Sequence, residues 1–423
     1  MVGPLQRRSK SIIDYSKYLP NDLWLEIFLL LPLDSIFTSK CVSKLWLSLL
    51  SKPSFITRRF NNFNTPELPW TLFLHLHRPV NRSISTVSLD IHSKFICGHD
   101  GFSFKFLPSK PSPYNKEDLI FLLASSNGLV LCSTRRYYQM RYYICNPLTK
   151  KWIVVPRRPP NAHHKWVING FICESSSSLA STSYKVVRVP EFKDPLTNFE
   201  IEIYSSNVGE WNIYKVSCPH QVTMLYNFSN NVVSGPNGVL YWIEVGEIKI
   251  IAYNPNDNHN NNDENGEKCR LIDLPIREGV NYDREYIFGV SEGLISYSYT
   301  QSGELSIWVL EDDLITGGWI WHLVHEIELE DMLAENSEAD WFINQLSMGL
   351  VTLKPLAFNP IDRNVVILGY EVSFIFAYNI ETRRLKMLNI SCNSHPSFDI
   401  YPTYGGELPF VPFVLTPKPT PIL

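Results

Sequence analysis

The hydrophobic and polar positions of this chain follow two patterns, which meet between about residues 60 and 68. From Leu19 to about Phe60 the large apolar residues recur at intervals of three and four, the spacing of one helix face. Beyond that point they come in short runs rich in Val, Ile, Tyr, Phe and Trp, separated by Gly, Asn-Gly and Asn-Pro, which is typical of antiparallel strands. The pattern predicts a small all-α region followed by a large all-β domain.

We expect three short helices in the first region. The apolar residues of the first helix lie in two adjacent lines: Leu23, Ile27 and Leu30 in one, and Trp24, Phe28 and Leu31 in the other. Pro32 ends this helix, a second covers Ser35 to Ser39, and a third runs from about Val42 to Leu49.

These helices are apolar around almost their whole circumference. A region of about 40 residues rarely folds alone without a disulfide, a metal or a partner, and this one has the residues for neither a disulfide nor a metal site. A partner protein is therefore expected to cover the helices, because exposed apolar patches mark interaction sites. The alternative is that they pack on the β-domain as an N-terminal cap.

The β part contains a weak internal repeat. A turn-and-strand unit occurs as SNGLVLC (126–132), PNGVLYW (236–242) and SEGLISY (291–297). Each is followed by a second strand and turn: YYICNPLTKKW (142–152), IIAYNPND (250–257) and LSIWVLEDD (305–313). Two further copies begin with YKVVRV (184–189) and NVVILGY (364–370), and aligning Trp152 with Trp211 and Leu385 places three residues at one turn position: Asn146, Ser205 and Asn379.

Repeated four-stranded antiparallel sheets arranged radially form a β-propeller, which is the fold that we predict. Additional strands are expected at Thr71–Leu76, Val87–Ile91, Phe102–Leu107 and Phe410–Leu415, and they bring the expected number of blades to about 6–8. A β-sandwich or an irregular all-β domain is the alternative.

Charge, cysteine content and the N-terminal sequence limit the classes of partner and the cellular compartments that we expect. The 38 basic and 42 acidic residues give a net charge of −4, so we expect neither nucleic acid nor a membrane surface as a partner. The eight cysteines lie more than three positions apart, several within apolar runs, and are expected to be reduced and buried. The N-terminus has no apolar signal-peptide core, which favours the cytoplasm or the nucleus.

The usual local signs of an enzyme are absent from the sequence. There is no G-x-S-x-G, P-loop, G-x-G-x-x-G or H-E-x-x-H pattern, so no catalytic, cofactor-binding or metal-binding residue is predicted. His163-His164 lacks a nearby cysteine or carboxylate at ligand spacing. The acidic residues of the stretch 326–335 are read as a solvated helix face: Glu326, Glu328, Glu330 and Asp331.

The chain therefore divides into five predicted parts. They are a disordered basic tail (1–17), a helical module (18–60), a linker (61–69), the β-propeller-like domain (70–416) with a disordered loop at 256–268, and a tail (417–423).

The helical module resembles the F-box. The resemblance is carried by Leu19-Pro20, Ile27, Leu31-Pro32, Cys41-Val42-Ser43-Lys44-Leu45-Trp46 and Pro53-Ser54-Phe55, and it departs from the pattern only at Leu47, where the family often has arginine. The segments SNGLVLC, CNPLTKKW, YKVVRV, EIYSSNVGEW, VLYW, LSIWVLED and AFNP, spread from about residue 120 to 390, are similar to the kelch-like F-box-associated domain of plant F-box proteins.

The resemblance implies a non-catalytic substrate receptor of an SCF (Skp-cullin-F-box) ubiquitin ligase, whose β-domain binds the target. It implies that the F-box binds a Skp-type adaptor, and through it cullin and a RING protein, using these residues: Leu19, Pro20, Leu23, Ile27, Leu31, Pro32, Leu33, Ile36, Cys41, Val42 and Trp46. The alternatives are an F-box interaction protein without ligase output and a propeller lectin or enzyme.

Target recognition is expected on the loops at one rim of the propeller, because strands supply the frame and loops vary freely. We select the segments Arg135–Arg141, Arg157–Trp166 and Tyr282–Tyr286, which are rich in aromatic and basic residues. Their candidate contact residues are Arg135, Tyr137, Tyr138, Arg141, His163, Trp166, Tyr282 and Tyr286.

Overall fold

The computed structural model describes most of the chain. The described residues are 19–31, 35–36, 39–40, 42–50, 55, 58, 70–74, 83–88, 102–108, 120–135, 138–147, 150–158, 164, 166–175, 182–225, 232–235, 238–244, 249–256, 269–275, 285–312, 318–336, 353–370, 374–391 and 410–414. They fall into two compact units, Met1–Pro66 and Glu67–Leu423, and the division lies within the predicted linker.

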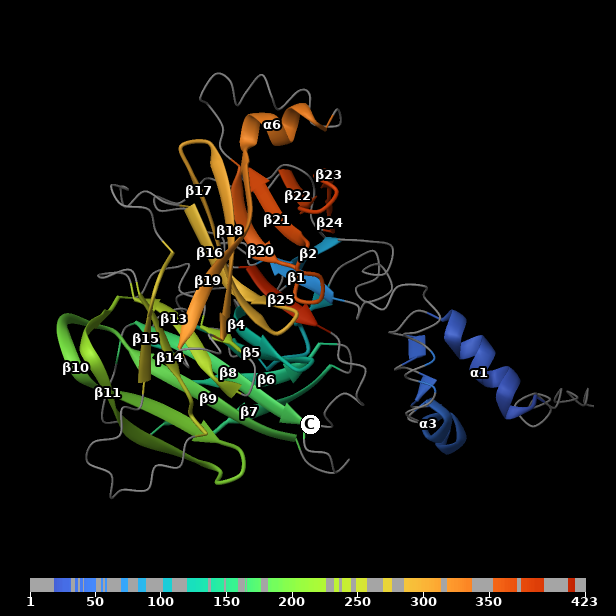
Figure 1. Cartoon of the computed structure of the whole chain (residues 1–423). Coiled ribbons are helices and arrows are strands. Elements are labelled where there is room, and N and C mark those ends of the chain that lie inside the picture. The colour runs from blue at the N-terminus through green and yellow to red at the C-terminus, as the bar shows by residue number, and fades with distance from the viewer. Residues whose placement is uncertain are drawn as a thin grey trace, which may run out of the picture. The chain divides into compact units, whose positions relative to one another are not determined.

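The first unit contains the helices α1 (Asn21–Leu30) and α3 (Lys44–Leu50), shown in Figure 1. Pro20 precedes α1, which suits proline because the first N–H groups of a helix have no partner within it. The hydroxyl of Ser43 accepts a hydrogen bond of 3.1 Å from the backbone N–H of Trp46 and so caps α3. Residues 35, 36 and 39 are helical, and the rest of the expected second helix lies outside the described residues.

In the described part of the second unit there are five four-stranded antiparallel sheets, which we call blades 1 to 5. Blade 1 is β4 (Phe121–Ser126), β5 (Leu129–Ser133), β6 (Tyr142–Asn146) and β7 (Lys151–Val155). Blade 2 is β8 (Val167–Ser175), β9 (Thr182–Pro190), β10 (Phe192–Ser205) and β11 (Glu210–Met224). Blade 3 is β12 (Val233–Ser234), β13 (Leu240–Glu244), β14 (Lys249–Tyr253) and β15 (Cys269–Asp273).

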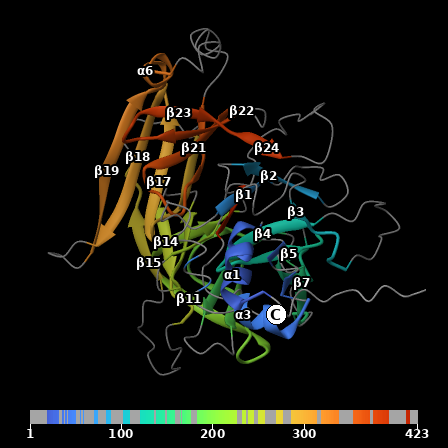
Figure 2. The same cartoon turned by 90° about the vertical axis from the view of Figure 1, so that its right-hand side faces the viewer.

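Blades 4 and 5 follow in the same order and are seen side by side in Figure 2. Blade 4 is β16 (Glu285–Ser291), β17 (Leu294–Gln301), β18 (Glu304–Asp312) and β19 (Trp319–Glu328). Blade 5 is β20 (Lys354–Phe358), β21 (Val365–Tyr370), β22 (Phe374–Asn379) and β23 (Arg384–Met387). The short helix α6 (Leu329–Ala334) leads from β19 towards blade 5.

A sixth sheet joins strands from both ends of this unit, and we call it the closing sheet. It has the order β24-β2-β1-β25, with β3 paired to β2. Its strands are β1 (Trp70–Leu74), β2 (Ser83–Ser88), β3 (Phe102–Ser103), β24 (Asn389–Ser391) and β25 (Phe410–Val414). The first strands of neighbouring blades contact one another from β4 to β20, and β25 contacts both β20 and β4, which completes a ring.

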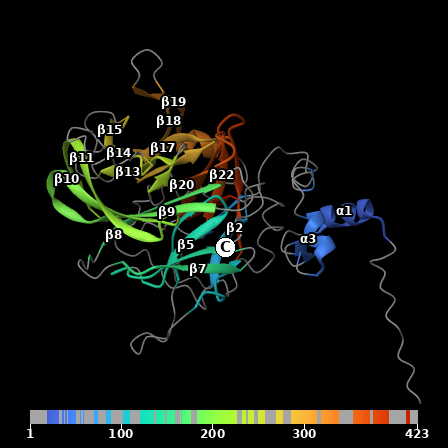
Figure 3. The ribbon, with the colours of Figure 1, turned by 90° about the horizontal axis from the view of Figure 1, so that it is seen from below.

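The domain is therefore a β-propeller with five regular four-stranded blades and a closing sheet, and Figure 3 shows it from below. Five regular blades are fewer than the about 6–8 that the sequence predicted, and the closing sheet is the sixth member of the ring. The sequence placed the extra strands only approximately. Residues after Ser103 turn instead of continuing as a strand, because the N–H of Leu107 bonds to the carbonyl of Phe104 at 3.0 Å.

The core of the propeller lies between the blades. One buried cluster joins blades 2 and 3 through residues such as Ile201, Val216, Leu240 and Trp242. Comparable clusters lie between the other successive blades, and Trp70 and Leu72 of the closing sheet pack with Ile367 and Ile375 of blade 5. Burial of these faces is the main force that holds the blades in order.

The predicted repeat is confirmed in the positions of the turns. Asn127-Gly128 and Glu292-Gly293 both have positive φ angles and join the first two strands of blades 1 and 4 in tight hairpins. The three aligned turn residues each end the third strand of their blade: Asn146, Ser205 and Asn379.

Two other expectations need correction. Cys218 of β11 and Cys269 of β15 form a disulfide, although the cysteines were expected to be reduced; the two residues are 51 positions apart and meet only because blades 2 and 3 pack together. Cys132, Cys145 and Cys173 are free and buried. In the acidic stretch Glu326 and Glu328 belong to β19, and only the residues from Leu329 onward are helical.

Within the described ranges, no helix is long and apolar enough to cross a membrane. The same part of the chain contains no group of three or more His, Cys, Asp or Glu side chains arranged to hold a metal ion. The expected loop at 256–268, apart from Asn256, lies outside the described residues.

Candidate functional site: the helical surface and one propeller rim

The two apolar lines of α1 have different surroundings. Trp24 and Phe28 face α3, where their ring centroids lie 4.8 and 5.0 Å from the ring of Trp46. The other line stays exposed, with 51% of Leu23, 41% of Ile27 and 82% of Leu30 accessible to solvent. The helices thus cover one line with each other and leave the second line uncovered within their own unit.

Apolar residues at and just before α3 are exposed as well. Val42, Leu45 and Leu47 are all exposed, and an ion pair joins Arg58 to Glu26 beside α1. With Leu23, Ile27 and Leu30, six large apolar residues of a module of about 40 are exposed, and exposed apolar surface of this kind marks interaction sites.

The structure separates the predicted adaptor contacts into groups. Pro20, Leu23, Ile27 and Val42 are exposed, and Leu19 and Leu31 are partly exposed. Ile36 is buried and Trp46 packs on Trp24 and Phe28, so both support the fold of the module. Pro32, Leu33 and Cys41 lie outside the described residues. Leu30, the most exposed apolar residue of α1, was not among the predicted contacts although it lies in the line of Leu23 and Ile27.

Two of the predicted rim segments come together at one end of blade 1. The β5–β6 loop ends at Tyr142 and the β7–β8 loop begins after Val155, and these two residues pair with each other at the end of the sheet. Both loops therefore leave the sheet at the same rim. The loop that carries Tyr282 connects β15 to β16 and corresponds in topology to the β7–β8 loop.

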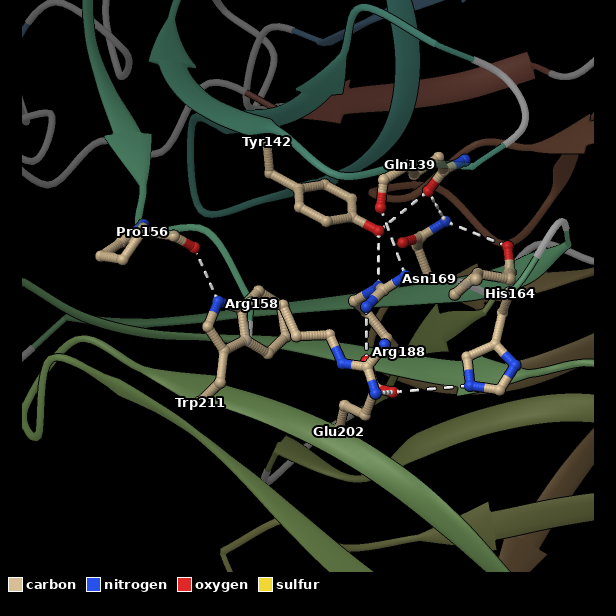
Figure 4. A network of polar contacts seen from close by, with 10 residues as sticks. Gln139, Tyr142, Pro156, Arg158, His164, Asn169, Arg188, Glu202 and Trp211 are labelled. Atoms are coloured by element: carbon tan, nitrogen blue, oxygen red, sulfur yellow. Dashed lines mark hydrogen bonds and ion pairs between the residues drawn. The ribbon is translucent and has the colours of Figure 1, made fainter. Parts of the chain in front are cut away.

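A buried carboxylate ties these loops to blade 2, as Figure 4 shows. Glu202 of β10 is only 2% exposed and forms ion pairs with Arg188 of β9 and Arg158 of the β7–β8 loop. Nε2 of His164, from the same loop, lies 3.9 Å from a Glu202 carboxylate oxygen. Both partners of such an ion pair are needed, because a buried charge without an opposite charge beside it destabilises the folded protein.

Arg188 also connects the network to blade 1. Its Nε donates a hydrogen bond of 2.8 Å to the hydroxyl of Tyr142, and its Nη2 donates one of 3.3 Å to the backbone carbonyl of Gln139. The guanidinium lies over two rings, 5.7 Å from the centroid of Tyr142 and 5.8 Å from that of Trp211. The indole N–H of Trp211 donates to the carbonyl of Pro156 at 2.7 Å, which fixes the start of the β7–β8 loop.

Burial dominates the ionisation of this network. It raises the pKa of Tyr142 to about 12, so the hydroxyl is protonated at neutral pH. Burial also raises the pKa of Glu202, against the opposing effect of Arg188 and Arg158. Burial lowers the pKa of His164, and the positive charges of the same two arginines lower it further.

Only some of the predicted target-contact residues have side chains that are accessible to solvent. Arg135 and Tyr138 are exposed, and Arg141 and Trp166 are partly exposed. Tyr286 instead packs against Tyr297 in the core between blades 3 and 4, with ring centroids 6.0 Å apart. Tyr137, His163 and Tyr282 lie outside the described residues.

The residues that organise the rim were missed. Arg188 and Glu202 stand within apolar strands, YKVVRV and FEIEIYS, where a charged residue at a position otherwise expected to be buried is the available signal.

The fold and these surfaces define a class: a β-propeller protein with a small helical module whose apolar surface is uncovered. Family models match both parts, the F-box domain over residues 18–58 and the β-propeller of F-box protein At3g26010-like proteins over residues 96–400. The chain belongs to this family of F-box β-propeller proteins.

Relatives from Arabidopsis thaliana support the assignment. F-box protein At5g03970 is 25% identical over 382 residues, which cover 87% of this chain and 82% of the relative. F-box protein At3g26010 is 25% identical over 398 residues, which cover 91% of this chain and 82% of the relative. Among solved structures, virginiamycin B lyase from Staphylococcus aureus matches with 12% identity and a TM-score of 0.31, covering 65% of this chain and 70% of that one, a likeness too weak to carry an argument.

Proposed function

We propose that the protein is the substrate-recognition subunit of an SCF ubiquitin ligase. The exposed apolar line Leu23, Ile27 and Leu30 carries the first half of the proposal, because it is a continuous helix face without a cover in its own unit. A Skp-type adaptor would supply the cover, and cullin and the RING protein would join through that adaptor.

The size of this surface is compatible with specific binding. Each large apolar side chain gains about 2 kcal/mol on full burial, so six of them give roughly 12 kcal/mol before costs. Association costs about 4–15 kcal/mol, so other contacts must contribute and a few anchor residues should dominate. Ile27 is the best single anchor to test, because it lies between Leu23 and Leu30 on the exposed line.

The propeller would bind the target protein and would have no bond chemistry of its own. Its role is to raise the effective concentration of a target lysine near the charged ubiquitin carrier, a proximity effect. The rim built by the β5–β6 and β7–β8 loops supports this role, because its loops are anchored on buried side chains of two blades. Such a receptor would act in the cytoplasm or the nucleus, where its partners would meet it.

Co-purification tests the proposal. The tagged full chain, expressed in plant cells, is expected to retain a Skp-type adaptor and a cullin, and the purified assembly is expected to transfer ubiquitin to a bound protein. Ile27→Asp is expected to lose adaptor and cullin together, while Ile213→Asp, an equally polar change at an exposed site on β11, is expected to retain both. Adaptor retention by Ile27→Asp would contradict the docking surface. Adaptor binding without ubiquitin transfer would favour the interaction protein without ligase output.

A further inference from the structure

The β5–β6 loop presents two large side chains on either side of a buried one. Gln139 is 3% exposed, whereas Tyr138 is 46% and Met140 is 45% exposed. The side-chain oxygen of Gln139 accepts hydrogen bonds from the Tyr142 hydroxyl at 3.0 Å and from Asn169 Nδ2 at 2.8 Å. The buried amide thus fixes the loop between two exposed side chains.

The backbone at Tyr138 is unusual as well. Its φ angle is +50°, a left-handed conformation that residues other than glycine adopt rarely. Strained backbone of this kind collects at binding sites, where the surrounding structure holds it in place. Here the bonds of Gln139 and Arg188 hold the loop, so the exposure of Tyr138 and Met140 is a fixed feature of the rim.

Three arginines with exposed or partly exposed side chains lie at the same rim. Arg141 precedes Tyr142 and Pro156 follows Val155, so Arg141 and the start of the β7–β8 loop leave the sheet as neighbours. Arg135 and Arg157 are exposed beside them. Arg135, Arg141 and Arg157 therefore offer three guanidinium groups at this rim, whereas the whole chain has a net charge of −4.

We propose that this surface, the anchored rim (Arg135, Tyr138, Met140, Arg141 and Arg157), binds an acidic peptide segment that also carries an apolar side chain. Arginine forks pair with carboxylates in two-point hydrogen bonds. Tyr138 and Met140 pack on the apolar side chain, since tyrosine and methionine offer adaptable contact area. The inference rests on the proposed function, for which it names the class of target segment.

Peptide selection on the full chain tests the inference. Random peptides displayed on phage are the probe, and enrichment of sequences that combine Asp or Glu with an aromatic or aliphatic residue is expected. A synthetic copy of an enriched peptide should bind more weakly as salt rises, because exposed charges are screened. The triple variant Arg135→Glu, Arg141→Glu, Arg157→Glu should weaken binding by about tenfold or more, since three attractive pairs become repulsive.

A matched triple controls for charge and folding. Lys150→Glu, Lys151→Glu and Lys386→Glu reverse three exposed lysines away from the anchored rim, two at the opposite end of blade 1 and one on β23 of blade 5, and should leave the affinity unchanged. Tyr138→Ala with Met140→Ala keeps every charge and should also weaken binding by about tenfold, as expected for two contact residues. This second variant decides the outcome if the arginine triple does not fold.

Three results would overturn the inference: no acidic enrichment, equal binding by the arginine triple, or binding only when phosphoserine replaces the Asp and Glu residues of the peptide. The last would assign the rim to phosphopeptides.

Adaptor capture is measured on the same samples. Intact capture with failed peptide binding would reject only this inference, whereas lost capture with intact peptide binding would reject only the proposed function.

Discussion

At the scale of single residues, charged side chains buried between strands decide how the rim is built. Arg188 and Glu202 are Cα partners on β9 and β10, and their pairing extends to Arg158 of a loop that belongs to another blade junction. The sequence shows each charge but not the register that joins them. For the same reason it could not reveal that Cys218 meets Cys269, since that contact depends on how two blades pack.

Removing the central carboxylate should destabilise the propeller. Glu202→Gln leaves Arg188 and Arg158 without their ionic partner, and breaking a buried ion pair costs about 3–5 kcal/mol. The free energy of unfolding, measured with urea, should fall by this amount. Glu200→Gln, an exposed neighbour on the same strand, should change it by less than about 0.5 kcal/mol. Equal stability of the two variants would show that the network is not a stabilising unit.

At the scale of elements, local sequence signals were sufficient for α1, α3 and the turns, but not for the stretch 326–328, which belongs to β19. The two apolar lines of the first helix were visible at helical spacing, and the structure shows that one is covered by Trp46 while the other is exposed. The Gly-containing hairpins and the aligned ends of β6, β10 and β22 were equally readable, because turn chemistry is local. Tyr286 was selected as part of a rim loop, but it belongs to β16 and its ring packs against Tyr297, which the local sequence did not indicate.

The cap of α3 gives a prediction at this scale. Ser43→Ala removes the hydrogen bond to the N–H of Trp46 and should destabilise the helix by about 1 kcal/mol. Hydrogen exchange of the α3 amides should become about fivefold faster in the full chain, as this free energy implies. Ser48→Ala, on the exposed side of the same helix, should leave exchange equal or slower, since alanine is the better helix former. Unchanged exchange in Ser43→Ala would contradict the capping role.

At the scale of the whole propeller, closure joins segments from both ends of the unit. β25 pairs with β1 and also contacts β4 and β20, so a strand near residue 412 completes a ring that starts near residue 70. The sequence predicted these strands but not which of them pair, because pairing between residues more than 300 positions apart leaves no local pattern. The repeat was nevertheless enough to predict the propeller, since five blades share their turn positions.

Truncation tests the role of closure. A chain that ends at residue 408 lacks β25 and loses its ladder with β1, several hydrogen bonds of about 1 kcal/mol each. Its thermal midpoint should fall by several degrees. A chain that ends at residue 416 keeps β25 and should unfold at the midpoint of the full chain. Equal midpoints for both truncations would mean that the propeller does not depend on its last strand.

In the proposed function, the exposed line of α1 docks a Skp-type adaptor. The most direct measurement is the dissociation constant of purified adaptor for the full chain and for Ile27→Asp. Loss of about 2 kcal/mol of burial and placement of a charge in an apolar interface should weaken binding by at least about a hundredfold. The control Ile213→Asp should bind as tightly as the unmodified chain. Equal affinities for Ile27→Asp and the unmodified chain would show that the adaptor does not dock on this line.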